Sequence, residues 1–188
     1  GPRTRAAIEA SLGDIARYPD GNGHDLKQAL SRRYGVDMGQ VVLGNGSNDV
    51  LELVALAFLG PGRASVYSQH CFAVYPLATQ ARGARGIQVP AKDYGHDLDA
   101  MAAAIDEETY VLWIANPNNP TGTLLQPAAL EAFLKRVPER VLVVIDEASN
   151  EYLSPELKSE TVKWLRRHPN LIVSRTFSKA YEIGRAHV

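Results

Sequence analysis

The feature that most constrains the fold of this chain is a regular alternation of short apolar runs with helical segments. The apolar runs are three to five residues long and are bounded by turn residues, which is typical of buried strands. We predict strands at 41–43, 64–67, 86–89, 110–114, 141–145 and 171–173, and helices at 4–16, 25–34, 50–59, 72–81, 98–105, 127–136 and 159–167. This alternation predicts an α/β sandwich in which helices cover a mainly parallel sheet.

Composition limits the partners of such a chain. Apolar residues make up 45% of the 188 residues, which is enough to bury a sizeable core. The formal net charge is -1 with both signs interspersed, so we expect no face for nucleic acid or a membrane surface. Cys71 is the single cysteine, which excludes a disulfide within the chain, and no metal cluster is predicted. There is no apolar stretch as long as a membrane span and no signal-peptide pattern, so we expect a cytoplasmic protein.

Polar stretches rich in turn residues follow five of the predicted strands. They are Gly44–Asp49, Ser68–Phe72, Asn116–Gly122, Asp146–Ala148 and Ser174–Lys179. The carboxyl ends of parallel strands meet at one edge of a sheet, and open α/β sheets bind their ligands at that edge. The five stretches therefore predict one shared ligand site.

The stretch Gly44–Asp49 leads into a predicted helix. Free backbone N–H groups and the positive end of the helix dipole converge at such a start, which suits a phosphate group. The motif alone is weak, because it is neither a Walker loop nor the dinucleotide fingerprint. The alternative is an ordinary helix start capped by Ser47 or Asn48. Both interpretations can hold, since a capping side chain can also contact a phosphate.

Lys179 follows the last predicted strand in the hexapeptide Ser174–Lys179, which also contains Thr176 and Ser178. A lysine amine can form a Schiff base with an aldehyde cofactor such as pyridoxal phosphate, while nearby hydroxyls hold its phosphate. Taken alone, the hexapeptide favours a plainer alternative, a surface lysine after an edge strand. The other stretches decide whether the rest of a cofactor site is present.

Those stretches contain a candidate for each further need of the cofactor. The pyridine nitrogen needs a carboxylate at the end of a buried strand, and Asp146 fits, although an isolated Asp is more commonly a cap or turn residue. The phenolic oxygen needs a donor such as Asn119, aimed by a cis bond to Pro120; most such bonds are trans, and a plain turn is the alternative. Phe72 is a candidate to stack on the ring, and a core phenylalanine is at least as common. The candidate phosphate donors are Ser47, Asn48, Thr176 and Ser178.

Six motifs occur in one order and spacing: Tyr18-Pro19-Asp20-Gly21, Gly44-Asn45-Gly46-Ser47, Phe72-Ala73-Val74-Tyr75, Asn118-Asn119-Pro120-Thr121-Gly122, Asp146-Glu147-Ala148 and Ser174-Arg175-Thr176-Phe177-Ser178-Lys179-Ala180. In combination they resemble the fold-type I, class I/II aminotransferases, and within that family most closely the histidinol-phosphate aminotransferases. The resemblance runs from about residue 1 to residue 181. It implies a three-layer α/β sandwich that is an incomplete large domain of a pyridoxal phosphate-dependent transferase.

The resemblance implies a role for each candidate. Lys179 would carry the cofactor as a Schiff base and move the proton between the substrate's Cα and the cofactor's C4′. Asp146 would pair with the pyridine nitrogen, Asn119 with the phenolic oxygen, and Phe72 would stack on the ring. The residues implied around the phosphate are Ser47, Asn48, Thr176 and Ser178. Tyr18 matches a tyrosine that reaches the partner subunit's phosphate, which implies a homodimer with shared active sites.

Two positions depart from the family pattern. Ser149 stands where the family usually has an aromatic residue, often a tyrosine that bonds to the phenolic oxygen, so Asn119 is expected to hold that oxygen alone. The family's phosphate-binding arginine belongs eight residues after Lys179, where this chain has His187. Arg185 is out of register, so no arginine is assigned.

The resemblance also predicts how the chain is organised. Residues 1–23 are expected to form an N-terminal helix and a turn that reaches a partner, and residues 24–181 part of the cofactor-binding large domain. Residues 182–188 resemble a translated sequencing adapter, which predicts a non-native tail. We expect the chain to lack the family's small domain and the N-terminal segment that closes over substrate. The fragment alone is therefore expected to be inactive.

The predicted function is ping-pong aminotransfer from L-histidinol phosphate to a 2-oxo acid such as 2-oxoglutarate, in histidine biosynthesis. Another enzyme of the same fold, such as an aromatic aminotransferase or threonine-phosphate decarboxylase, is one alternative, because it would keep the same cofactor residues. A non-catalytic phosphate- or nucleotide-binding α/β domain is the other. It would use Gly44–Asp49 and leave Lys179 as an ordinary side chain.

Overall fold

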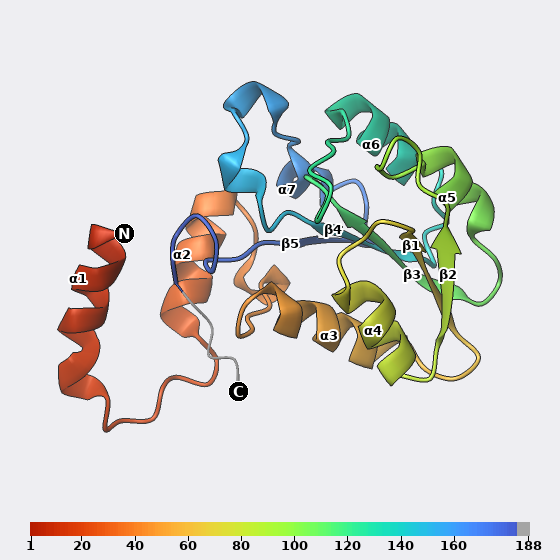
Figure 1. Ribbon diagram of the computed structural model, residues 1–188. Coiled ribbons are helices and arrows are strands. Elements are labelled where there is room, and N and C mark those ends of the chain that lie inside the picture. The colour runs from red at the N-terminus through yellow and green to blue at the C-terminus, as the bar shows by residue number, and fades with distance from the viewer. Residues whose placement is uncertain (184–188) are drawn as a thin grey trace.

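Five parallel strands form one sheet in the order β2-β1-β3-β4-β5 (Figure 1). The computed structural model describes residues 1–183 of the chain. The strands are β1 Ala64–Ser68, β2 Arg85–Val89, β3 Thr109–Ala115, β4 Leu142–Asp146 and β5 Leu171–Ser174. Within the described residues every strand pairing is parallel, so the predicted parallel sheet is confirmed.

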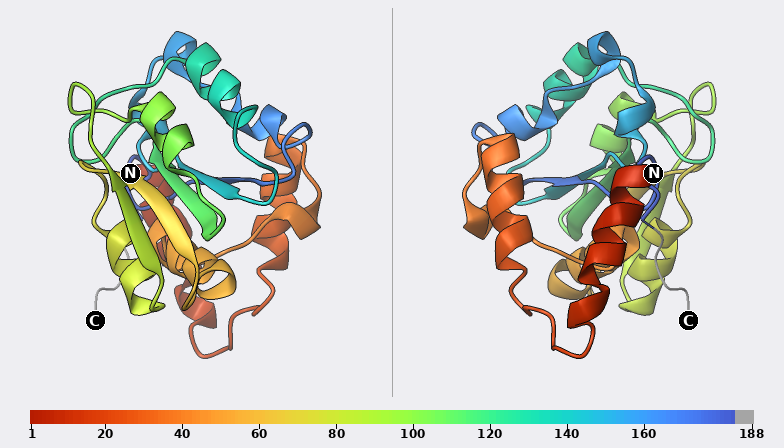
Figure 2. Two further views of the ribbon diagram at one scale, coloured as in Figure 1. Left: turned by 90° about the vertical axis from the view of Figure 1, so that its right-hand side faces the viewer. Right: turned by 90° about the vertical axis from the view of Figure 1, so that its left-hand side faces the viewer.

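Helices cover both faces of this sheet, which confirms the three-layer sandwich (Figures 1 and 2). One face packs against α3 (Ser47–Phe58) and α4 (Val74–Ala81). The other face packs against α5 (Leu98–Ala104), α6 (Pro127–Leu134) and α7 (Thr161–Trp164). The remaining regular elements are α1 Pro2–Ser11, α2 His24–Tyr34 and four short 3-10 turns at Leu12–Asp14, Met38–Gln40, Asn150–Tyr152 and Pro155–Leu157.

The core lies on both sides of the two central strands, β3 and β4. Alternate residues of a strand point to opposite faces, so an uninterrupted apolar strand supplies both cores. Leu112 and Val143 are in register and face the α5–α7 layer, whereas Trp113 and Val144 are in register and face α3 and α4. All four are fully buried, and burial of each such side chain stabilises the fold by roughly 1.5–3 kcal/mol.

The first helix stands apart from the sandwich (Figure 1). None of its residues is buried, and Ile8 and the following Leu12 and Ile15 are exposed. Its start contacts the segment after β5, where the N-terminal ammonium pairs with Glu182 and Thr4 Oγ1 donates to the Tyr181 carbonyl at 3.2 Å. An apolar helix face without cover within the described chain suits a contact with another polypeptide.

Four details of the predicted elements are wrong. The run 41–43 is not a strand, because it pairs with none of the five described strands; three apolar residues indicate partial burial, not sheet pairing. The helix predicted at 4–16 ends at Ser11 and continues only as a 3-10 turn. The helix predicted at 72–81 begins at Val74. The helix predicted at 159–167 is reduced to the single turn α7.

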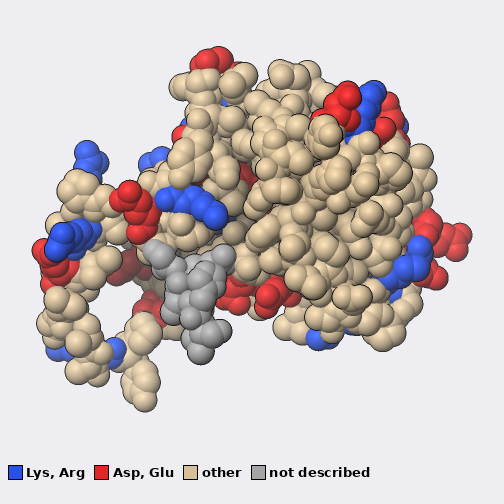
Figure 3. Space-filling view, in the orientation of Figure 1, with Lys and Arg blue, Asp and Glu red and all other residues tan. Residues whose placement is uncertain are grey.

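The charged residues are spread over the surface. On the face shown in Figure 3, acidic and basic side chains lie intermixed around a broad area of uncharged residues. No helix of the described residues combines the length and the apolar character that crossing a membrane requires.

Candidate functional site

Four of the five polar stretches lie where the sequence predicts, directly after β1, β3, β4 and β5. The fifth, Gly44–Asp49, follows an unpaired extended segment and not a strand, so its predicted setting is corrected. It nevertheless begins α3, which packs on the same sheet. The carboxyl ends of the parallel strands therefore bring the stretches to one edge.

Asp146 is the last residue of β4 and is buried, with an exposed fraction of 4%. Its Oδ2 accepts a hydrogen bond from the Tyr75 hydroxyl at 2.9 Å, and its Oδ1 accepts one from the Ala148 N–H at 3.2 Å. Burial raises the pKa of this carboxyl, while the two donors and the positive charge of Lys179 oppose the rise in pKa. The structure thus places a hydrogen-bonded carboxyl within electrostatic reach of Lys179.

Tyr75 is a site residue that the sequence analysis did not assign. Its ring stacks on Trp113, with centroids 5.3 Å apart, and meets the edge of Phe72 at 5.8 Å. Burial raises the pKa of its hydroxyl well above the ordinary value, so the hydroxyl stays protonated and donates to Asp146. The available signal was the motif Phe72-Ala73-Val74-Tyr75, which places one aromatic residue just before α4 and the other in its first turn.

Replacing Tyr75 with phenylalanine is expected to lower the free energy of unfolding by roughly 1.5–3 kcal/mol, the usual contribution of a hydrogen bond to a charged group. The aromatic packing on Trp113 is kept, so the loss reports on the bond to Asp146. Urea unfolding should show a lower midpoint with an unchanged slope. A midpoint equal to that of the wild type would mean that the hydroxyl does not hold Asp146.

The start of α3 has the properties predicted for an anion site, but its cap differs from the prediction. Gly46 is the N-cap, at φ 80° and ψ 174°, so Ser47 and Asn48 are the first helical residues and neither is the cap. Among the described residues, the backbone N–H groups of Ser47, Asn48 and Asp49 have no acceptor. The Asn48 Oδ1 atom is buried without a partner there as well. Three free donors at a helix start fit a phosphate.

Substituting Gly46 with alanine is expected to cost roughly 1–3 kcal/mol of stability, because its backbone conformation is one that residues with a Cβ rarely adopt. The substitution should also weaken phosphate binding, since it disturbs the first turn of α3. Gly60→Ala is the matched control, because a Cβ at Gly60 meets nothing within 4 Å and its φ is not positive. Equal unfolding midpoints for the two variants would show that the backbone conformation of Gly46 does not require glycine.

Thr176 and Ser178 lie close to the start of α3. A cavity of about 810 Å³ is lined by Gly44, Gly46, Thr176 and Ser178 together with apolar side chains of α2. The Thr176 and Ser178 hydroxyls are 2.6 Å apart, and the Ser178 N–H donates to Thr176 Oγ1 at 3.1 Å. This local turn holds both hydroxyls close together on one short loop.

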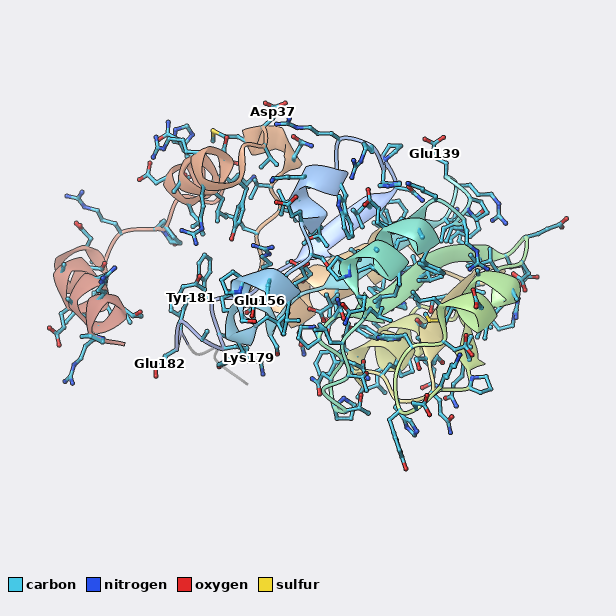
Figure 4. The ribbon with its side chains drawn as sticks, turned by 90° about the horizontal axis from the view of Figure 1, so that it is seen from above. Asp37, Glu139, Glu156, Lys179, Tyr181 and Glu182 are labelled. Atoms are coloured by element: carbon cyan, nitrogen blue, oxygen red, sulfur yellow. The ribbon has the colours of Figure 1, made fainter. Side chains whose placement is uncertain are left out.

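Lys179 is exposed on the loop that leaves β5, with Tyr181 and Glu182 further along it (Figure 4). Phe72 is half-buried beside Tyr75, at the Asp146 end of the edge. Asn119 is exposed, and its bond to Pro120 is cis, as the sequence analysis proposes. The neighbouring Asn118 is buried and donates to the His70 carbonyl at 2.8 Å, which ties the loop after β3 to the loop after β1.

Two of the positions considered in the sequence, Tyr18 and Ser149, stay outside this cluster. Tyr18 is fully exposed and joins no residue of the site in its own chain. Ser149 caps a 3-10 turn, and its hydroxyl has no hydrogen bond to another described residue. His187 and Arg185 lie outside the described residues, as does most of the tail predicted at 182–188.

The residues present include donors that suit a phosphate and a carboxyl that suits a ring nitrogen, and the cavity described above is lined by Gly46, Thr176 and Ser178 but not by Asp146 or Lys179. Free N–H groups and paired hydroxyls lie at the α3 end, and a buried carboxyl lies at the β4 end. The Ser174 hydroxyl, in register with Asp146, is buried without a partner among the described residues. Burial raises the pKa of the Cys71 thiol to about 11, so Cys71 is a poor nucleophile. No group of three or more metal-ligating side chains converges in the described chain.

Comparison with known proteins gives one consistent result. The family model for aminotransferase class I and II matches residues 3–184. Histidinol-phosphate aminotransferase 2 of Nitrosospira multiformis is 58% identical over 187 residues, which are 100% of this chain and 48% of that protein. The chain therefore spans about half the length of the curated relatives it matches.

Solved structures resemble the fold closely. Histidinol-phosphate aminotransferase of Sinorhizobium meliloti, in complex with pyridoxal-5′-phosphate, matches with a TM-score of 0.91 and 32% identity, over 97% of this chain and 50% of that one. L-threonine-O-3-phosphate decarboxylase of Porphyromonas gingivalis matches with a TM-score of 0.82 and 24% identity, over 97% of this chain and 53% of that one. At that identity the second likeness shows the fold alone.

Proposed function

The chain belongs to the class I and II aminotransferase family, and on that premise we propose that the whole protein is a pyridoxal phosphate-dependent aminotransferase acting on L-histidinol phosphate. The observation that carries the proposal is the buried Asp146 carboxyl, bonded to Tyr75 and within electrostatic reach of Lys179. A lone surface lysine would have no such partner. The identity of 58% to a histidinol-phosphate aminotransferase supports the choice of substrate.

Pyridoxal phosphate, when bound, supplies an electron sink that makes a proton on the substrate's Cα removable. In this proposal Lys179 would hold the cofactor covalently through Nζ and, once the substrate's amine has displaced it, the freed amine would move the proton at the substrate's Cα. Asp146 keeps the pyridine nitrogen protonated, Asn119 donates to the phenolic oxygen, and Phe72 covers the ring. The residues that bind the phosphate are the start of α3 and the loop after β5: Ser47, Asn48, Thr176 and Ser178.

The proposal includes a homodimer with shared active sites. Its support is the full exposure of Tyr18, which follows the uncovered apolar residues Ile8, Leu12 and Ile15. Tyr18 would reach the phosphate bound by the partner subunit. We also propose that the protein is located in the cytoplasm. There it would catalyse a step of histidine biosynthesis, with 2-oxoglutarate as the amino acceptor.

A half-reaction tests the proposed activity. The whole protein, loaded with pyridoxal phosphate, is mixed with L-histidinol phosphate in the absence of a 2-oxo acid. The absorbance of the cofactor's aldehyde form should convert to that of its amine form, and 2-oxoglutarate should reverse the change. We expect the second-order rate constant for L-histidinol phosphate to exceed that for phenylalanine by at least about 100-fold, because the proposed substrate carries a phosphate that phenylalanine lacks, and a site that bonds such a group rejects an analogue without it.

The alternatives give different outcomes in the same experiment. Faster conversion with phenylalanine would indicate an aromatic aminotransferase. Release of carbon dioxide from O-phosphothreonine would indicate a decarboxylase of the same fold. A protein that binds phosphate but takes up no pyridoxal phosphate would be a non-catalytic binding domain, and the proposed function would be wrong.

A further inference from the structure

Two charged side chains next to the site have no role in the proposed reaction. Glu147 directly follows Asp146 and has a side chain that is 2% exposed. Arg175 directly precedes Thr176 and has a side chain that is 25% exposed. Buried charges are costly unless they are paired, so their retention beside an active site calls for a physical reason.

The two side chains form a hydrogen-bonded ion pair. Arg175 donates to Glu147 Oε2 from Nε at 2.9 Å and approaches it with Nη2 at 2.7 Å. The other oxygen, Glu147 Oε1, accepts from the Thr161 hydroxyl of α7 at 2.7 Å. The guanidinium also lies over the ring of Tyr34, 5.0 Å from its centroid, at the end of α2. We call this ion pair the Glu147–Arg175 clamp.

The clamp joins the two loops that carry the cofactor candidates. The backbone N–H of Glu147 donates to the Ser174 carbonyl at 2.8 Å, which extends the β4–β5 pairing by one residue. The side-chain pair adds a second connection one residue later, at Arg175, which immediately precedes Thr176. The end of β4 carries Asp146, and the loop after β5 carries Lys179, so the clamp links the two segments that carry these residues.

We propose that the Glu147–Arg175 clamp is a positioning device that fixes the loop after β5 against the end of β4, and thereby sets Lys179 and the phosphate hydroxyls relative to Asp146. This inference rests on the proposed function for its catalytic consequence. Arg175 acts through the backbone of residues 176–179 and does not itself contact the reacting atoms.

A competing role for Arg175 is direct phosphate binding, because it also lines the cavity shared with Thr176 and Ser178. The geometry favours positioning, since Nε and Nη2 both point to one carboxylate oxygen. The two roles differ in what Glu147 does. Under direct binding, Glu147 competes with the phosphate for Arg175, and under positioning it supports the phosphate site.

The first test therefore uses Glu147→Gln, which keeps the shape and the acceptor for Thr161 but removes the charge. Positioning predicts that the dissociation constant for pyridoxal phosphate rises at least about tenfold. Direct binding predicts a constant that is unchanged or lower, because the arginine is released, and that result would overturn the proposal. The matched control is Asp99→Ala with Arg136→Ala, which removes an exposed ion pair between α5 and the residues after α6 and should leave the constant unchanged.

The second test separates positioning from general stability. The triple variant Glu147→Met, Thr161→Val and Arg175→Met replaces the clamp with apolar side chains of similar size, an exchange that is often neutral or stabilising in buried ion pairs. We expect an unfolding midpoint near that of the wild type together with weaker cofactor binding. A folded triple variant that binds pyridoxal phosphate as the wild type does would show that the pair is merely structural.

A third measurement needs no cofactor and so stands apart from the proposed function. In the cofactor-free triple variant, the amides of Glu147 and Ser178 should exchange hydrogen at least about tenfold faster than in the wild type, while the amides of β3 stay protected. Unchanged exchange at both amides would contradict the clamp. Failure of the wild type to bind pyridoxal phosphate would instead contradict the proposed function.

Discussion

Lys179→Ala is expected to lower aminotransfer by the whole protein at least about 10⁴-fold, because in the proposed reaction one side chain supplies both the covalent attachment and the proton transfer. The fold should be unaffected. Lys179 is exposed, and its side chain makes no hydrogen bond or ion pair to another described residue, so the free energy of unfolding should change by less than about 0.5 kcal/mol. Steady-state turnover and urea unfolding on the same preparation measure the two effects.

The control for this variant is Lys135→Ala, which removes an exposed lysine at the end of α6. It should retain full turnover. The assay contains no added free lysine or other amine. If Lys179→Ala then retains more than about 1% of wild-type turnover, another group moves the proton.

Asp146→Asn is the second large effect, with an expected loss of roughly 10²–10³-fold in turnover, the usual result of removing one preorganised electrostatic contact. Asparagine has nearly the same shape but cannot keep a pyridine nitrogen protonated. Cofactor-free protein should remain folded, because Tyr75 can still donate to the remaining side-chain oxygen. Turnover and the dissociation constant for pyridoxal phosphate measure the loss.

The same variant has a pH signature in the cofactor-free protein. Burial raises the pKa of Asp146 above 3.8, so the folded state holds its proton to higher pH than the unfolded state does. The free energy of unfolding contributed by this group therefore falls as the pH rises from about 3.8 through the folded-state pKa. Asp146→Asn should remove this decline, and urea unfolding at several pH values measures it.

Asp99→Asn is the matched control, because the pKa of Asp99 is shifted in the opposite direction from that of Asp146. The hydrogen bond from Arg136 lowers the pKa of Asp99, so its small contribution is present above 3.8 and is lost as the pH falls. Identical pH profiles for wild type and Asp146→Asn would mean that the Asp146 carboxyl is not perturbed by burial.

The fold followed from local pattern to a large extent. Strands β3 and β4 carry uninterrupted apolar residues, and such runs between helical segments leave few topologies other than a covered parallel sheet. The run 41–43 shows where local pattern fails, because three apolar residues do not determine whether a neighbouring strand is available for pairing. Whether an extended segment pairs is decided by the sheet as a whole.

The candidate site could be predicted in part for a related reason. Asp146 is the last residue of one apolar strand and Lys179 lies on the loop that leaves another, so their position near one sheet edge follows from topology. Tyr75 and Arg175 could not be assigned in this way. Their partners, Asp146 and Glu147, are 71 and 28 residues away in sequence, and no local pattern encodes a contact at such separation.

The most direct test of the central claim is to locate the covalent attachment of the cofactor. The protein is incubated with pyridoxal phosphate, reduced with sodium borohydride to fix the carbon–nitrogen bond, digested, and analysed by peptide mass spectrometry. We predict one stoichiometric adduct on the peptide that contains Lys179. A stoichiometric adduct on another lysine of the folded protein, or none, would contradict the assignment of Lys179 and the site built around it.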